Sequence, residues 1–143
     1  MKNKIYFLSF FITIILISTQ LTFSHTEFRT KKTCPICNTT FQTTLDGSGT
    51  QFGMRLDLKP VGPIAAPWRI PVCPKCHFVL FKNNLTSEEI EKYKKLVDSE
   101  EYKKFAINNS SHFLLAKIYE YSEFDSFKIA LTYLQASWQV ESD

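Results

Sequence analysis

Two short stretches, Cys34-Pro-Ile-Cys37 and Cys73-Pro-Lys-Cys76, hold all four cysteines of this 143-residue chain and decide how it folds. A tight C-x-x-C turn presents two thiolates toward one point, and two such turns facing each other supply the ligands of a tetrahedral ion. The proline after the first cysteine fixes one backbone dihedral, so less entropy is lost on binding. We therefore predict one tetrathiolate site, most simply structural Zn²⁺, with the ligands Cys34, Cys37, Cys73 and Cys76.

Three alternatives for the same cysteines remain open at this point. An exported chain with an even number of cysteines can form disulfides between the two turns. Iron can occupy the same four thiolates, as in rubredoxin, because ligand identity does not separate zinc from iron. The string Cys73-Pro-Lys-Cys76-His77 also matches the C-x-x-C-H attachment sequence of haem c, with His112 as the one downstream residue able to be the far ligand. Iron or haem would make the protein an electron carrier.

The composition around the cysteines favours short strands and turns. All six prolines lie between positions 35 and 74, and all four glycines lie between positions 47 and 62, which excludes a long helix there. We expect a small zinc ribbon over residues 33–82, preceded by an irregular lead-in over residues 25–33. The run Phe78-Val-Leu-Phe81 predicts a short buried strand leaving the second cysteine pair.

A helical period takes over after Asn84, because neither glycine nor proline occurs from position 75 to the end. Thr86 followed by Glu89 predicts a capping box. Further helix starts are expected at Asp98, at Ser110 or Ser111, and at Asp125. Apolar residues at helical spacing predict the buried faces of three or four helices over residues 86–142. The buried face of the last helix is predicted to contain Phe127, Ala130, Leu131, Leu134 and Trp138.

The first 24 residues predict export. A short basic start is followed by an apolar run from Ile5 to Ile17, which has the length of a signal-peptide core, and small or polar residues before His25 suit a cleavage site. The alternative is an uncleaved anchor, because residues 5–24 reach the roughly 20 residues that cross a bilayer as a helix. Both interpretations place the remaining chain in an extracytoplasmic compartment such as the periplasm, with membrane contact only through an uncleaved N-terminal segment.

Charge and spacing exclude two classes of function. The chain has 17 basic and 14 acidic side chains. Two of the lysines, Lys2 and Lys4, lie in the leading segment, so 15 basic against 14 acidic groups remain and give no basic face for nucleic acid. Four thiolates leave no open coordination position for a catalytic zinc, and no Ser-His-Asp or Cys-His pairing follows from the spacing. We expect no catalytic residues and no enzyme activity.

For the other histidine, acidic and aromatic side chains we predict structural or surface positions. His77 is expected to be exposed or to lie behind the ligands, and His112 to lie on the surface at a helix start. Asp46 and Asp57 are expected at turns or strand ends. The aromatic content of 15% is most simply core, which includes Phe41, Phe52, Trp68, Tyr119, Tyr133 and Trp138.

The order of these elements resembles a bacterial family of uncharacterised proteins that pair a CPxC zinc ribbon with tetratricopeptide-like (TPR-like) helices. The resemblance covers roughly residues 33–141. The family often has glycine after the second cysteine of a knuckle, where this chain has Asn38 and His77. The resemblance rests on the two cysteine pairs, on Pro67-Trp-Arg-Ile-Pro71, and on the packing positions Leu115-Ala116, Tyr119, Ala130 and Leu134.

This resemblance implies an α+β, metal-binding and non-enzymatic module. It also implies that the last two helices form a hairpin like one TPR unit. Repeat arrays usually need three or more units to stand alone. We therefore expect the C-terminal helices either to dock a protein partner or to reflect a reading frame truncated at Asp143.

Overall fold

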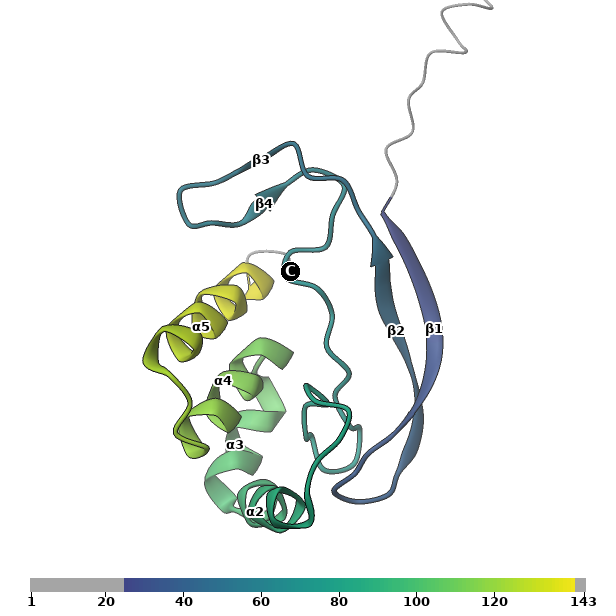
Figure 1. The fold of residues 1–143 in the computed structure, drawn as a ribbon, viewed down its shortest axis with the longest axis vertical. Helices are drawn as coiled ribbons and strands as arrows, with labels where there is room; N and C mark the ends of the chain where they lie inside the picture. The colour runs from purple at the N-terminus through teal and green to yellow at the C-terminus, as the bar shows by residue number, and fades with distance from the viewer. Residues whose placement is uncertain (1–24, 141–143) are drawn as a thin grey trace, which may run out of the picture.

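The first structural element is a long antiparallel hairpin of β1 (Thr26–Thr33) and β2 (Thr40–Ser48). The structure is a computed structural model and describes residues 25–140 (Figure 1). The irregular lead-in predicted for residues 25–33 is therefore wrong. Most side chains of β1 are exposed, and its sequence shows no alternation of apolar and polar residues. The segment is a strand because it pairs with β2.

A second, smaller sheet joins β3 (Gly53–Met54) to β4 (Pro60–Val61). The strand predicted for residues 78–81 is not formed, because only a single bridge pairs Val72 with Val79. Phe78 and Val79 are nevertheless buried, as the prediction required. They are held beside the second cysteine pair by turn hydrogen bonds instead of a ladder.

Four helices follow in the part of the chain that the structure describes, and with the two sheets they confirm the α+β class. The capping box of Thr86 and Glu89 is confirmed. Asp125 accepts hydrogen bonds at the start of the last helix, as predicted, whereas the second helix is capped by Ser99, one residue after the predicted Asp98. The helices are α2 (Ser87–Asp98), α3 (Glu100–Asn108), α4 (Ser111–Tyr121) and α5 (Ser126–Val140).

The cysteine region and the helices share one core. Phe78 packs against Tyr93 of α2 with ring centroids 5.4 Å apart, and Phe81 packs against Tyr119 of α4 at the same distance. Tyr102 of α3 is buried and its hydroxyl donates a hydrogen bond of 3.0 Å to the carbonyl oxygen of His77. The helical half therefore holds the second cysteine turn directly.

The helical pattern predicts α5 less well than α4. Trp138 is buried and Leu134 is half-buried, but Phe127 is 74% exposed and Ala130 is exposed, which corrects their predicted inward positions. His112 is also corrected, because it is 4% exposed and lies against Gln139 of α5. Burial lowers the pKa of His112, although the hydrogen bond with Gln139 opposes the shift.

The aromatic side chains outside the helices are only partly in the core. Phe41 is partly buried and packs on it. Phe52 and Trp68 are exposed, so their assignment to the core is wrong. Their region has many prolines and few repeating contacts, and aromatic character alone does not decide which side of a loop faces water.

The predicted signal peptide or anchor at residues 1–24 lies outside the described residues. Within residues 25–140, no helix combines the length and the apolar character that crossing a membrane requires.

We predict that Tyr102→Phe lowers the free energy of unfolding by about 1–2 kcal/mol, because the buried carbonyl of His77 loses its donor. Urea denaturation of the metal-loaded protein measures the change. Tyr121→Phe is the matched control, since Tyr121 of α4 is 41% exposed and the substitution keeps the ring under Lys92, so the value should change little. Equal losses in both variants would contradict the role given to the Tyr102 hydroxyl.

Candidate metal centre

The two cysteine turns are built alike. In the first, the amide of Cys34 donates to the carbonyl of Thr39 and the amide of Asn38 donates to the carbonyl of Cys34, both at 2.9 Å. In the second, Cys73 and His77 repeat both bonds at 2.9 Å, with Phe78 in the place of Thr39. Each turn is thus closed around its first cysteine, and we call the two turns the knuckles, residues 34–39 and 73–78.

Each knuckle needs a left-handed residue directly after its second cysteine. Asn38 has φ 56° and His77 has φ 57°, at the positions where glycine would be least strained. Asparagine adopts this conformation more readily than most residues, and histidine is also enriched there. The non-glycine residues at these positions therefore leave the knuckle geometry intact.

The four sulfur atoms converge on one point. The Sγ atoms of Cys34 and Cys76 are 3.6 Å apart, those of Cys37 and Cys73 are 3.4 Å apart, and all four lie within 4.8 Å of one another. Zn–S bonds of about 2.3 Å in a tetrahedron place neighbouring sulfurs about 3.8 Å apart. The spacing fits one tetrahedral ion, with each close sulfur pair joining one knuckle to the other.

The same distances bear on the disulfide alternative. All four cysteines are free thiols in the structure. Their closest sulfurs, at 3.4 and 3.6 Å, are well outside the roughly 2.05 Å of a disulfide. Four free thiols gathered at one centre are the donor set of a metal ion.

The environment of the sulfurs is uneven. Burial raises the pKa of Cys34 to about 11, against backbone hydrogen bonds that lower it. Burial also raises the pKa of Cys37, but hydrogen bonds from the side chain and backbone of Thr39 and from Cys73 outweigh it and bring the value to about 6. The pKa of Cys76 is raised by burial and by the neighbouring cysteines. A bound cation would remove this cost by holding the sulfurs as thiolates.

The centre is closed on its inner side. Cys34 and Cys73 are completely buried, whereas Cys37 and Cys76 are partly exposed. Ile36, Phe78 and Val79 belong to the same buried cluster and keep water from the inner sulfurs. A site with four protein ligands and an apolar back suits a structural ion, because no coordination position remains for a substrate.

His77 takes part through its backbone. Its amide closes the second knuckle and its carbonyl oxygen accepts the hydrogen bond from Tyr102. The group of ligand atoms consists of the four cysteine sulfurs. His77 is therefore placed to shape the centre from outside the ligand set.

A charged cluster that the sequence did not predict lies at the far end of the β1–β2 hairpin. The carboxylate of Asp46 is fully buried and accepts hydrogen bonds from the Arg69 amide at 2.6 Å and the His25 ring at 2.8 Å. The guanidinium of Arg69 also pairs with Glu27 at 2.6 Å. Although His25, Glu27 and Asp46 are close enough to hold a metal ion, Arg69 already supplies the positive charge. We assign this cluster to holding β1 against the loop before the second knuckle.

This cluster corrects the assignment of Asp46 to a turn or strand end. Burial raises the pKa of Asp46, but hydrogen bonds from Arg69 and His25 outweigh it, so the carboxyl pKa lies below its usual value. The position of Asp46 opposite Glu27 in the hairpin register would have indicated the cluster. That signal was hidden because β1 itself was not predicted.

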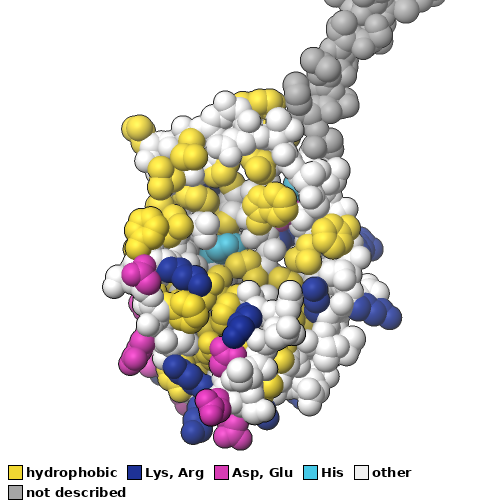
Figure 2. Space-filling model, viewed as in Figure 1, with side chains coloured by type: hydrophobic (Ala, Val, Ile, Leu, Met, Phe, Trp, Pro, Cys, Tyr) yellow, Lys and Arg dark blue, Asp and Glu magenta, His cyan; other side chains and the backbone are white. Residues whose placement is uncertain are grey.

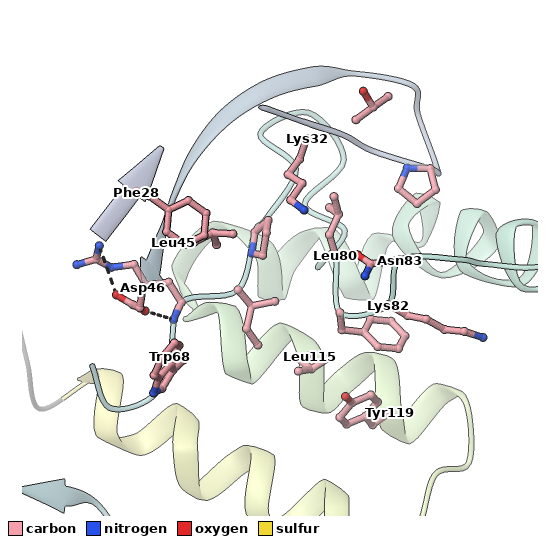
Figure 3. Close-up of a pocket in the computed structure, with 16 residues that line it drawn as sticks. Phe28, Lys32, Leu45, Asp46, Trp68, Leu80, Lys82, Asn83, Leu115 and Tyr119 are labelled. Atoms are coloured by element: carbon pink, nitrogen blue, oxygen red, sulfur yellow. Dashed lines mark hydrogen bonds and ion pairs between the residues drawn. The ribbon is translucent and has the colours of Figure 1, made fainter. Parts of the chain in front are cut away.

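A cleft of about 560 Å³ separates the β1–β2 hairpin from α4. Figure 3 shows Leu115 and Tyr119 on the α4 side, Trp68 at one end and Lys32 extending from the hairpin. The walls are largely apolar, and the hydrogen bonds of Asp46 close one end. The cleft can receive an apolar side chain next to a cation.

We predict that His77→Val lowers the free energy of unfolding by about 1–2 kcal/mol or more, because a β-branched residue is strained at φ 57°. His77→Gly should keep or raise the stability. Thermal denaturation of both metal-loaded variants measures this difference. Should the valine variant match the glycine variant, the left-handed conformation does not limit the knuckle.

Comparisons with protein-family models, with curated proteins and with solved structures found no match for this chain. The features of the chain that bear on its function are therefore the cysteine centre and the surrounding surfaces.

Proposed function

We propose that this is an exported zinc-ribbon protein that acts as a structural or protein-interaction module. The observation that carries the proposal is the convergence of Cys34, Cys37, Cys73 and Cys76 within 4.8 Å of one another. Zinc would join the two knuckles and fix the ribbon over residues 33–82. Metal binding contributes about 10–16 kcal/mol in zinc-finger peptides, which is as much as the whole net stability of many domains.

The arrangement of the sulfurs favours an ion held by four thiolates over attached haem. Haem attachment would use Cys73 and Cys76 as thioether links and leave the first knuckle without a role, yet each sulfur pair here joins both knuckles. Iron fits the same four thiolates and is the alternative that geometry alone leaves in place. An iron centre would make the function electron transfer.

The C-terminal helices are the proposed contact for a protein partner. α4 and α5 pack against each other as a TPR-like hairpin would, and α4 carries most of the buried side chains of the pair. The outer side of α5 exposes Phe127 and Ala130 to solvent. We propose Phe127, on the face of α5 that the fold leaves uncovered, as the centre of the contact.

Export is proposed from the sequence of residues 1–24. Their basic start and apolar run suit either a signal peptide or an anchor, and each takes the cysteine centre across the membrane. In an oxidising compartment a bound ion would protect the four thiolates from disulfide formation. The metal would then both shape the ribbon and preserve its ligands.

We predict that the purified protein is colourless and contains one zinc ion per chain, measured by elemental mass spectrometry. Cys73→Ser should remove the metal and abolish the cooperative unfolding transition, because the ribbon and the helices share one core. Pro74→Ala is the matched control, since it changes the same knuckle and leaves four sulfur ligands. It should keep the zinc and lose about 1 kcal/mol or less of stability.

Three results would overturn the zinc assignment. They are one iron per chain with a reddish absorption, a Soret band from attached haem, and a Cys73→Ser variant that keeps the melting temperature of the parent.

We predict a protein partner on the outer side of α5. A photo-crosslinking amino acid at Phe127 should give one discrete crosslinked product in the native host, identified by mass spectrometry. The same group at Glu91 on the exposed side of α2 is the control and should not give that product. Identical products at both positions, or none at Phe127, would contradict the proposed contact.

A further inference from the structure

The β3–β4 hairpin, residues 50–63, is an arm with apolar side chains facing water. Leu56 at its tip is fully exposed, Phe52 is 62% exposed and Met54 is 58% exposed. Leu58 and Val61 are each about half exposed. Five of the exposed large apolar residues thus lie on one short hairpin. Single exposed apolar residues are common on protein surfaces, but a group of five on one element indicates a contact surface.

The hairpin is a defined element and not a loose loop. The amide of Thr50 donates to the carbonyl of Pro63, and the amide of Phe52 donates to the carbonyl of Val61 at 2.8 Å. Gly62 has φ 141°, and a Cβ there would collide with the carbonyl oxygen of Thr50. The apolar arm is therefore held in shape by its own backbone.

The tip of the hairpin contains a leucine at a position where a purely structural turn would have glycine or asparagine. Leu58 has φ 64°, a left-handed conformation that asparagine or glycine adopts at lower cost. The turn is closed by hydrogen bonds between Arg55 and Lys59 and between Leu58 and Arg55. A strained leucine that presents its side chain to solvent points to a role for that side chain outside the fold.

The charged residues of the hairpin are mostly basic. Arg55 pairs with Asp57 at 3.2 Å, and the ammonium of Lys59 donates to the carbonyl oxygen of Trp138 at 3.0 Å. Lys59 thereby fixes the hairpin over the end of α5. The hairpin thus carries a net charge of +1 beside its apolar tip, and a positive charge favours the surface of an anionic bilayer.

The hairpin lies at the end of the molecule where the chain enters the fold. Thr26, the first residue of β1, pairs with Ser48, two residues before the hairpin begins (Figure 1). Figure 2 shows hydrophobic side chains over this end, while Lys, Arg, Asp and Glu side chains gather over the middle and the opposite end. The 20 residues before His25, from Ile5 to Ser24, contain no charged side chain.

We propose that the β3–β4 hairpin rests on the lipid bilayer that residues 5–24 enter as an uncleaved anchor. The anchor brings the end of the domain that carries His25 to the membrane surface, and the apolar tip then inserts among the lipid headgroups. Arg55, whose side chain is 47% exposed while it pairs with Asp57, lies beside the tip and faces the lipid headgroups. Phe127 is exposed in the first turn of α5, at the end of that helix remote from the Lys59–Trp138 contact, and stays accessible.

The test uses the full chain reconstituted in phosphatidylcholine–phosphatidylglycerol nanodiscs with ordinary or brominated acyl chains. A tryptophan is added at the hairpin tip by Leu56→Trp, or in the first turn of α5 by Phe127→Trp. Both positions are exposed, so neither substitution disturbs the core. We expect brominated lipid to remove most of the fluorescence added at position 56 and to leave that added at position 127 unchanged.

Other outcomes overturn the proposal. Equal quenching at the two positions means that the hairpin does not lie on the bilayer. A crosslink from position 56 to residues 5–24 means that the arm is covered by the chain itself, and a crosslink between two copies at position 56 means that it is covered by a second copy. A mature chain in cells that begins at His25 removes the anchor and contradicts the proposal independently of the zinc centre.

Discussion

The meeting of two cysteine turns at one point is the constraint on which the rest of the structure depends. The close sulfur pairs join residues that are 42 and 36 positions apart, and each pair links one knuckle to the other. Burial raises the pKa of Cys34 and Cys76, so holding these sulfurs as thiolates is unfavourable without a cation. A bound ion makes the free energy of holding these thiolates favourable. That gain offsets the entropy lost when the long connection between the knuckles is closed.

The helices depend on the same centre. Cys34 and Cys73 belong to the buried cluster that also contains Tyr93, Tyr102 and Ile118, so the metal site and the helical core are one packed unit. The hydroxyl of Tyr102 joins the two halves at the carbonyl of His77. The knuckles therefore act as a rigid block against which α2, α3 and α4 are packed.

The two ends of the molecule carry different surfaces. At one end the chain enters β1, the cluster of Asp46, His25 and Arg69 secures that entrance, and the β3–β4 hairpin exposes its apolar tip. Charged side chains gather over the middle and the other end of the molecule (Figure 2). The domain thus presents an apolar surface at the end where the chain enters, and it holds the metal centre at the other end of the β1–β2 hairpin (Figure 1).

The amino-acid sequence by itself determined the local features: the four metal-ligand candidates, the capped starts of the helices and the change from turns to helix near Asn84. These follow from neighbouring residues, such as the two C-x-x-C turns and the reciprocal bonds of Thr86 and Glu89. The tertiary structure alone decided the strand β1, the buried carboxylate of Asp46 and the burial of His112. Each of these depends on a partner distant in the sequence, and pairing at long range leaves no local pattern to read.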